Sequence, residues 1–281
     1  MKSKFYNTAP LPFVGQKRNF IKHFKEELHS KVAPPLYVDL FGGSGLLSRA
    51  AKDVHPTAKV VYNDFDNYRK RLKTISKTNK ILQDLRVLVD GIERKKIVPK
   101  EIKEKIINRI KQESGFIDFI TLSSSLLFSM KYVSSIQELE KETLYNKVKI
   151  NNYPTAKDYL DDIEVVSTDY KKVFEKYKDV ENVVFLIDPP YLSTDCSTYS
   201  SDGYWKLKDY LDVLKTLQNQ NYFYFTSNKS SIIELCEWIS DYTGGLNPFE
   251  NAAKKEYKAS MNHNATYTDI MLFKWTQTTT Y

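Results

Sequence analysis

The tetrapeptide Asp188-Pro189-Pro190-Tyr191 directly follows a run of apolar residues, VVFLI. Two successive prolines fix the backbone φ angles and remove two N–H donors. The Asp188 carboxylate and the Pro189 carbonyl remain as acceptors, which suits the two N–H bonds of an exocyclic amine. Tyr191 supplies a ring on which a base can stack. The tetrapeptide therefore favours a site for a planar, amine-bearing ring over a rigid turn with a surface tyrosine.

A second stretch that could do chemistry is VDLFGGSG, residues 38–45. A glycine turn between a strand and a helix lets a ligand approach the backbone closely. Asp64 follows Gly45 by nineteen residues, at the end of the next apolar run, where an acid can accept hydrogen bonds from both ribose hydroxyls. A dinucleotide is disfavoured because Ser48 stands at the third glycine of that fingerprint. The pattern favours a nucleoside ligand over a tight turn without a ligand.

Alternating strands and helices must position these residues. Short apolar runs predict buried strands at 36–41, 59–64, 180–188 and 221–228, and a late antiparallel strand at 267–275. Apolar residues at helical spacing predict helices over 18–30, 46–54 and 207–220, with another from about Asp66. A strand, a glycine turn, a helix and a second strand make a βαβ unit, so we expect an α/β fold with a parallel sheet.

Residues 68–158 interrupt this alternation, and we expect them to form a subdomain inserted into a domain made of 1–67 and 159–281. From Arg69 to Lys111 the chain has fifteen Lys or Arg but five Asp or Glu, a larger excess than the +7 of the whole chain. Such a charge run is commonly a solvated helix face. A polyanionic partner becomes the better interpretation because the chain also carries a site for a base.

Composition excludes several other classes of protein. The 281 residues are 41% hydrophobic and 27% charged, which is typical of a globular domain, and no apolar run is long enough to span a membrane. The N-terminus lacks the pattern of a secretory signal. Cys196 and Cys236 are far apart, and neither they nor the four histidines show metal-ligand spacing. We therefore expect a cytoplasmic protein without a metal.

Together these stretches resemble the DNA adenine methylase family, amino-methyltransferases that use S-adenosylmethionine and carry a D-P-P-Y motif. The resemblance covers roughly residues 10 to 275 and is weak inside the insertion. Each matching stretch is similar to one family motif: LPFVGQKRNF to the N-terminal motif, VDLFGGSG to the cofactor motif, YNDFD to the ribose acid, STDY to the acidic site for the cofactor's adenine, and FLIDPPY to the catalytic motif. The family's Gly-Gly-Lys is here Gly15-Gln16-Lys17, and its usual Trp is Phe13.

The resemblance implies a Rossmann-like S-adenosylmethionine-dependent methyltransferase sheet with an inserted, mainly helical target-recognition subdomain. It implies that the catalytic residues are Asp188, Pro189, Pro190 and Tyr191. The cofactor-binding residues that it implies are Phe13, Gly15, Lys17, Asp39, Phe41, Gly42, Gly43, Gly45, Asp64, Asp169 and Asp188. We expect DNA contacts from Arg94, Lys95, Lys96, Lys100 and Tyr199, the last in a polar loop at 193–205 that has the composition of a lid.

The implied function is site-specific N6-methylation of a flipped-out adenine in double-stranded DNA, for DNA modification or for protection from restriction. The family is typical of bacteria and their phages, and we expect a monomer or weak dimer. Methylation of a cytosine amino group or of an RNA adenine remains open, as does a basic nucleic-acid-binding protein without catalysis. Methylation of the cytosine ring is disfavoured, because it needs a cysteine, usually after a proline, and neither Cys196 nor Cys236 follows one.

Overall fold

A computed structural model describes residues 6–13, 15–128, 131–192, 205–262 and 265–275. The chain forms two compact units. The sheet unit comprises Met1–Asn7, Lys17–Phe65 and Asp162–Tyr281, and the helical unit comprises Thr8–Gln16 and Asp66–Asp161. The division expected from the sequence, at 67/68 and 158/159, differs from this one by a few residues at each boundary. It also differs at the N-terminus, where the segment Thr8–Gln16 groups with the helices.

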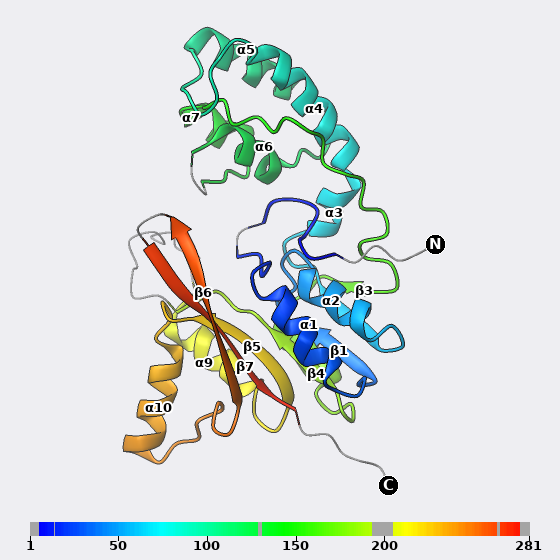
Figure 1. Ribbon diagram of the computed structural model, residues 1–281, viewed down its shortest axis with the longest axis vertical. Helices are drawn as coiled ribbons and strands as arrows, with labels where there is room; N and C mark the ends of the chain where they lie inside the picture. The colour runs from blue at the N-terminus through cyan, green and yellow to red at the C-terminus, as the bar shows by residue number, and fades with distance from the viewer. Residues whose placement is uncertain (1–5, 14, 129–130, 193–204, 263–264, 276–281) are drawn as a thin grey trace. The chain divides into compact units, whose positions relative to one another are not determined.

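The sheet unit contains a seven-stranded sheet in the order β3-β2-β1-β4-β5-β7-β6 (Figure 1). Its strands are β1 (Leu36–Asp39), β2 (Lys59–Asn63), β3 (Glu164–Val166), β4 (Val184–Ile187), β5 (Asn221–Ser227), β6 (Ala253–Asn262) and β7 (Ala265–Lys274). Neighbouring strands from β3 to β5 pair in parallel, whereas β7 pairs antiparallel with both β5 and β6. The mixed α/β architecture and the late antiparallel strand are as predicted, but β3 and β6 were not predicted.

Helices cover both faces of this sheet. They are α1 (Ile21–His29), α2 (Leu46–Val54), α8 (Tyr170–Tyr177), α9 (Leu207–Lys215) and α10 (Ile232–Thr243). Phe24 of α1 packs edge-to-face on Phe223 and Phe225, with ring centroids 5.0 and 5.7 Å apart. Tyr222 and Tyr224 instead lie in the core with α8, α9 and α10. This division follows from the alternation of side chains along a strand.

The central strands β1 and β4 lie side by side at the point where the strand order reverses. From β1 the sheet continues to β2 and β3, and from β4 it continues to β5. Open parallel sheets bind ligands at the carboxyl ends of the strands beside such a switch point. Directly beyond β1, the Leu40 amide donates to the Leu186 carbonyl at 3.0 Å. The glycine turn and the Asp-Pro-Pro-Tyr tetrapeptide therefore leave the sheet from adjacent strands.

The helical unit is built around a separate apolar core. Its helices in the described residues are α3 (Tyr68–Lys73), α4 (Ile75–Leu88), α5 (Lys100–Lys111), α6 (Phe119–Leu126) and α7 (Ile136–Lys141). The core draws on α4, α5 and α6, whose Leu82, Ile106 and Leu122 are fully buried. Each of these helices repeats apolar residues at the three- and four-residue spacing that forms one buried face.

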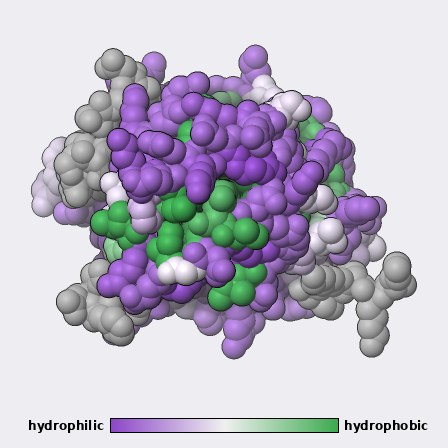
Figure 2. Space-filling model, turned by 90° about the horizontal axis from the view of Figure 1, so that it is seen from above, coloured by the Kyte–Doolittle hydropathy of each residue, from purple (hydrophilic) through white to green (hydrophobic). Residues whose placement is uncertain are grey.

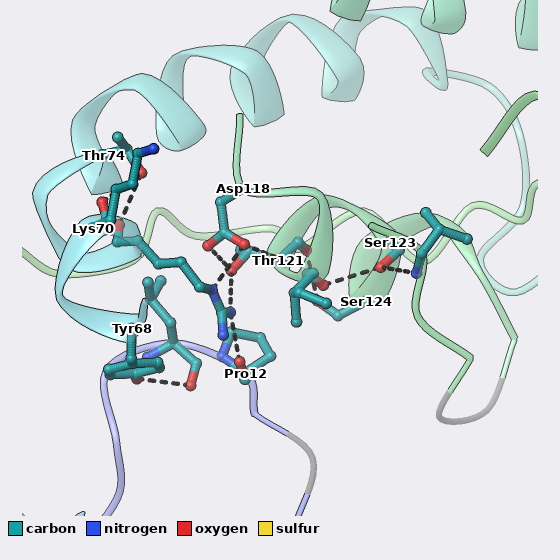
Figure 3. A network of polar contacts seen from close by, with 12 residues as sticks. Pro12, Tyr68, Lys70, Thr74, Asp118, Thr121, Ser123 and Ser124 are labelled. Carbon is teal, nitrogen blue, oxygen red and sulfur yellow. Dashed lines mark hydrogen bonds and ion pairs between the residues drawn. The ribbon is translucent and has the colours of Figure 1, made fainter. Parts of the chain in front are cut away.

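A buried polar network anchors the N-terminal segment within the helical unit (Figure 3). Arg71, only 4% exposed, donates from Nε to Asp118 Oδ1 at 2.9 Å and from Nη2 to the Pro12 carbonyl at 2.7 Å. The Tyr68 hydroxyl lies 2.9 Å from the Leu11 amide and 3.1 Å from its carbonyl. These bonds explain why the segment belongs to this unit, although α1 follows it closely in sequence.

The surface is that of a highly charged chain. Figure 2 shows a face on which hydrophilic residues surround a hydrophobic area. Within the described residues, no helix combines the length and the apolar composition needed to cross a membrane.

Candidate active site

Acidic residues gather at the carboxyl edge of the parallel sheet. Asp39 is the last residue of β1, Asp64 directly follows β2, and Asp188 directly follows β4. The three strands are neighbours in the sheet. The acids predicted from separate stretches of sequence therefore lie on one edge of one sheet.

Asp188 is paired with a buried lysine. Lys17 Nζ lies 2.7 Å from Asp188 Oδ2, and the two side chains are 9% and 16% exposed. The same ammonium lies 5.2 Å from the centroid of the Tyr191 ring. Burial raises the pKa of Asp188, and Lys17 opposes that rise. Lys17, expected among the cofactor-binding residues, thus lies against the predicted catalytic tetrapeptide.

The tetrapeptide is fixed on both sides of its prolines. Pro189 is buried and Pro190 is exposed. Beyond them, the Tyr210 hydroxyl of α9 donates to the Tyr191 carbonyl at 3.2 Å, and the Ser231 amide donates to the carbonyl of the next residue at the same distance. The backbone that carries the Asp188 carboxylate is therefore held by a strand on one side and by helices on the other.

The glycine turn has no room for side chains. A Cβ added at Gly42 would lie 2.1 Å from the Tyr62 ring and 2.9 Å from the Asn63 carbonyl. Gly45 precedes α2 with φ +70°, a left-handed conformation that favours glycine. The Tyr62 hydroxyl lies 2.8 Å from the Gly43 carbonyl and 3.1 Å from Asp64 Oδ1. Tyr62 therefore connects the turn to the predicted ribose acid.

Asp39 is a fully buried acid beside this turn. Its Oδ2 accepts a hydrogen bond from the Ser48 hydroxyl at 2.7 Å. Its Oδ1 has no hydrogen-bond partner among the described atoms. Burial raises the pKa of Asp39 to about 7, against the effect of the Ser48 hydrogen bond. A buried acceptor without a donor is costly, so this position fits a ligand that donates a hydrogen bond.

Asn63 joins three strand ends and was missed by sequence reasoning. Its Nδ2 donates to the Leu40 and Thr168 carbonyls at 3.0 Å each, and its Oδ1 accepts from the Thr168 amide at 3.1 Å. Asp169, which follows Thr168, is exposed and caps α8 by accepting from the Lys171 amide at 2.7 Å. The polar pair Asn63-Asp64 at the end of an apolar strand was the sequence signal that could have identified these Asn63 hydrogen bonds.

Aromatic rings line the same edge. The Phe41 ring lies 4.8 Å from that of Tyr170 and 5.7 Å from that of Trp205. The Tyr170 hydroxyl is buried and has no hydrogen-bond partner in the described part of the chain. Phe41 was predicted as a site residue, whereas Tyr170 and Trp205 were not. Their contacts depend on the meeting of distant segments, which no local pattern reveals.

Other predicted site residues belong to the helical unit or lie outside the described residues. Phe13 and Gly15 belong to the helical unit, where Phe13 packs on Tyr68 at 5.8 Å and Gly15 is exposed with φ +75°. The DNA-binding candidates Arg94, Lys95, Lys96 and Lys100 also belong to that unit. Tyr199, Cys196 and most of the proposed lid lie outside the described residues.

Cys236 is a poor nucleophile. It lies 1% exposed in the core beneath the sheet, and burial raises its pKa to about 12. The thiol is therefore not ionised at neutral pH. This agrees with its interpretation as an ordinary core residue.

Known proteins that are similar to this chain share the chemistry that the site geometry favours. The model of the family described as D12 class N6 adenine-specific DNA methyltransferase matches residues 13–261. A Haemophilus influenzae protein named "Putative methyltransferase" is 39% identical over 278 residues, which cover 97% of this chain and 94% of the relative. The family match includes the glycine turn, Asp64 and the tetrapeptide with its two acceptors for an amine. On this basis, the chain belongs to the D12 class of N6 adenine-specific DNA methyltransferases.

Proposed function

We propose that the protein transfers a methyl group from S-adenosylmethionine to the N6 amine of an adenine flipped out of double-stranded DNA, on a Rossmann-like sheet. The observation that carries this proposal is the placement of Asp188 and the glycine turn on adjacent strands at the switch point. A cofactor held by the turn and an amine held by Asp188 would meet at one edge. The same arrangement serves DNA modification and protection from restriction.

The residues of the sheet edge fit S-adenosylmethionine. The sulfonium of this cofactor supplies an already activated methyl group. Tyr62 packs against Gly42 where a Cβ would lie and bonds to the Gly43 carbonyl and Asp64, which holds the turn beside an acid that suits ribose hydroxyls. Asp39 Oδ1 can accept from the amino-acid part, while Phe41 and Asp169 flank the place expected for the adenine.

Asp188 and Pro189 would activate the target amine. Its lone pair is delocalised into the adenine ring, and hydrogen bonds to the Asp188 carboxylate and Pro189 carbonyl favour a pyramidal nitrogen. With the methyl donor bound, the amine nitrogen would form the new N–C bond as the S–C bond breaks and leaves a neutral thioether, and the surplus N–H proton would pass to the Asp188 carboxylate and then to water. Flipping the base costs a few kcal/mol, and stacking on Tyr191 offsets about 1–3 kcal/mol of it.

The first test is transfer itself. Purified protein incubated with labelled S-adenosylmethionine and double-stranded DNA is expected to yield labelled N6-methyladenine after digestion to nucleosides. Label found only on cytosine, or only on RNA when RNA is supplied, would show that the substrate is not adenine in double-stranded DNA. Cofactor and DNA binding without any transfer would favour a non-catalytic binding protein. Methylation-sensitive sequencing of DNA from expressing cells then gives the target sequence, and methylation without a shared sequence would contradict site specificity.

The structure divides the basic residues of the helical unit into two groups. Some support the fold: Arg109 pairs with Asp84 and Glu113, and the Arg94 guanidinium donates to the Val148 carbonyl. Lys95, Lys96 and Lys100 are exposed, and their ammonium groups make no hydrogen bond or ion pair within the described residues. We infer that these three lysines contact DNA and that Arg94 mainly holds its loop.

A second segment of the helical unit, around Asn146, pairs with the backbone of Lys95 and Lys96. The Lys95 amide donates to the Asn146 carbonyl at 2.8 Å, and the Asn146 amide donates to the Lys96 carbonyl at 2.9 Å. This pairing places Lys147 beside Lys95 and Lys96. Lys147 Nζ donates to the Leu127 carbonyl at 3.0 Å and lies 5.7 Å from the ring centroid of Phe128, which is 57% exposed. Lys147 therefore supports this segment, and an exposed ring near the exposed lysines suits a phosphate backbone with accessible bases.

Replacement of Lys95, Lys96 and Lys100 together by alanine is expected to weaken DNA binding. The plot of log affinity against log salt should lose about 0.9 in slope for each phosphate contact removed, or about 2.7 if all three lysines contact phosphates. Fluorescence anisotropy at several salt concentrations measures both effects. A matched variant that removes three exposed lysines of the sheet unit (Lys22, Lys172 and Lys208) should keep the wild-type slope. Equal slopes in the wild type, the Lys95/Lys96/Lys100 variant and the matched variant would show that these three lysines are exposed to solvent but do not contact DNA.

A further inference from the structure

Asp269 is a buried acid that directly precedes the apolar run of β7. It is 6% exposed, and the residues that follow it on β7 are Ile, Met, Leu and Phe. It lies opposite Ser227 of β5 and Tyr257 of β6. A carboxylate placed in this way requires a polar or charged partner.

The strand register shows which face Asp269 occupies. Residues directly opposite one another on antiparallel strands project to the same face. The Tyr257 ring lies 5.3 Å from that of Phe20 and stacks on His23 of α1 at 3.9 Å. Asp269 therefore projects from the face of the sheet that α1 covers.

Asp188 projects from the same face. Ile187 pairs with Tyr224, and both lie in the core on the opposite face, so alternation turns the next residue toward α1. Lys17 is at that place, 2.7 Å from Asp188 and one turn before Phe20, whose amide donates to the Lys17 carbonyl. Since β5 alone separates β4 from β7, both carboxylates lie on the side of the sheet where Lys17 meets Asp188, and Lys17 acts electrostatically on Asp269.

The charges around Asp269 agree with this placement. Burial raises its pKa to about 6, the Lys17 ammonium opposes the rise, and the Asp188 carboxylate adds to it. Tyr267 forms a hydrogen bond to Asp269. Arg18 acts on Tyr267 electrostatically, and Lys229 Nζ lies 5.2 Å from the Tyr267 ring. With Lys17, Asp188 and Asp269 all ionised, the cluster carries one net negative charge.

We propose that Asp269 is a second counter-ion of Lys17, which positions that ammonium while Asp188 holds the target amine. This inference rests on the proposed role of Asp188. An ammonium that is 9% exposed is destabilised if Asp188, the carboxylate 2.7 Å away, turns to another partner. A second carboxylate, Asp269, would keep the Lys17 ammonium stabilised while Asp188 binds the target amine. It also leaves the cluster negative as positive charge moves from sulfur to the amine nitrogen, which favours the transition state.

Asp269→Asn tests the proposal because it keeps the shape and an acceptor for Tyr267 but removes the charge. We expect kcat to fall about 10- to 100-fold, while the dissociation constant of S-adenosylmethionine changes less than about 3-fold. The acid limb of the kcat–pH profile should move to lower pH, since a like charge beside Asp188 is lost. Asp269→Glu should restore part of kcat and move the limb back.

Wild-type kcat and an unchanged pH profile in Asp269→Asn would overturn the proposal. If that variant does not fold, as judged by thermal unfolding, Tyr267→Phe gives the decision. It removes the hydroxyl whose hydrogen bond lowers the pKa of Asp269, so the acid limb of the kcat–pH profile is expected to move to higher pH, and an unchanged profile would overturn the role. Asp188→Asn is assayed in parallel. Full activity there would refute the proposed role of Asp188, whatever Asp269 does.

Discussion

Replacement of Asp188 by alanine is expected to abolish methyl transfer, with kcat reduced by roughly a factor of a thousand or more. The carboxylate is the charged acceptor at the end of β4, where the target amine is expected. Binding of S-adenosylmethionine should persist in part, because the glycine turn and Asp64 lie on other strands. Single-turnover kinetics with labelled cofactor measures transfer, and calorimetry measures binding.

The alanine variant also removes the carboxylate that lies 2.7 Å from the buried Lys17 ammonium, which costs stability. Asp188→Asn separates the two effects, because the amide keeps an acceptor but not the charge. We expect its activity to lie between those of the wild type and of Asp188→Ala. The control is Asp179→Ala, which removes an exposed acid of the sheet unit and should leave kcat unchanged. Transfer at the wild-type rate by Asp188→Ala would refute the assigned role.

Local rules were enough to predict that the acids of the candidate site lie at the ends of neighbouring strands. Apolar runs end where strands end, and both the glycine turn and the Asp-Pro-Pro-Tyr tetrapeptide begin at such ends. The carboxyl ends of parallel strands meet at one edge, so Asp39, Asp64 and Asp188 had to lie near one another once the strands were parallel. The stretches from which the chemistry was predicted were therefore the same stretches that predicted the ends of the strands.

The partners of these residues could not be predicted, because they depend on register between distant strands. Nothing near Lys17 in the sequence indicates Asp188, and nothing near Asp188 indicates Asp269. Ser48 shows the same limitation: it was noted as a departure from a glycine fingerprint, yet its hydroxyl donates to Asp39. A residue's type was visible in the sequence, but its hydrogen-bond partner was set by tertiary structure.

The basic stretch shows how tertiary structure changes the meaning of composition. Counted along the chain, Arg71, Arg94 and Lys100 contribute equally to its charge. In the structure Arg71 is buried against Asp118, Arg94 holds a backbone carbonyl, and Lys100 is exposed. Charge density therefore predicted the partner class without identifying which cations serve it.

Arg71 carries the largest expected effect on stability. Replacing it by alanine leaves Asp118, whose side chain is 1% exposed, as an uncompensated buried charge, and also removes the donor to the Pro12 carbonyl and one donor to the Thr121 hydroxyl, which still bonds to Asp118 (Figure 3). Breaking one side of a buried ion pair costs about 3–5 kcal/mol. We expect this loss to fall on the helical unit. Hydrogen–deuterium exchange should show lost protection in α3 and α6 and unchanged protection in β1 and β4.

A compensated variant distinguishes the loss of the ion pair from the burial of an unpaired charge. In Arg71→Met/Asp118→Asn both charges are removed, and the asparagine can still cap α6 by accepting from the Thr121 amide, as Asp118 does at 3.0 Å. Most of the lost stability should return, because well-packed neutral groups often replace a buried ion pair without cost. Lys111→Ala, which breaks an exposed pair with Glu140, should change stability by less than about 1 kcal/mol. If the double variant is as unstable as Arg71→Ala, the geometry of the network rather than its charge balance stabilises the unit.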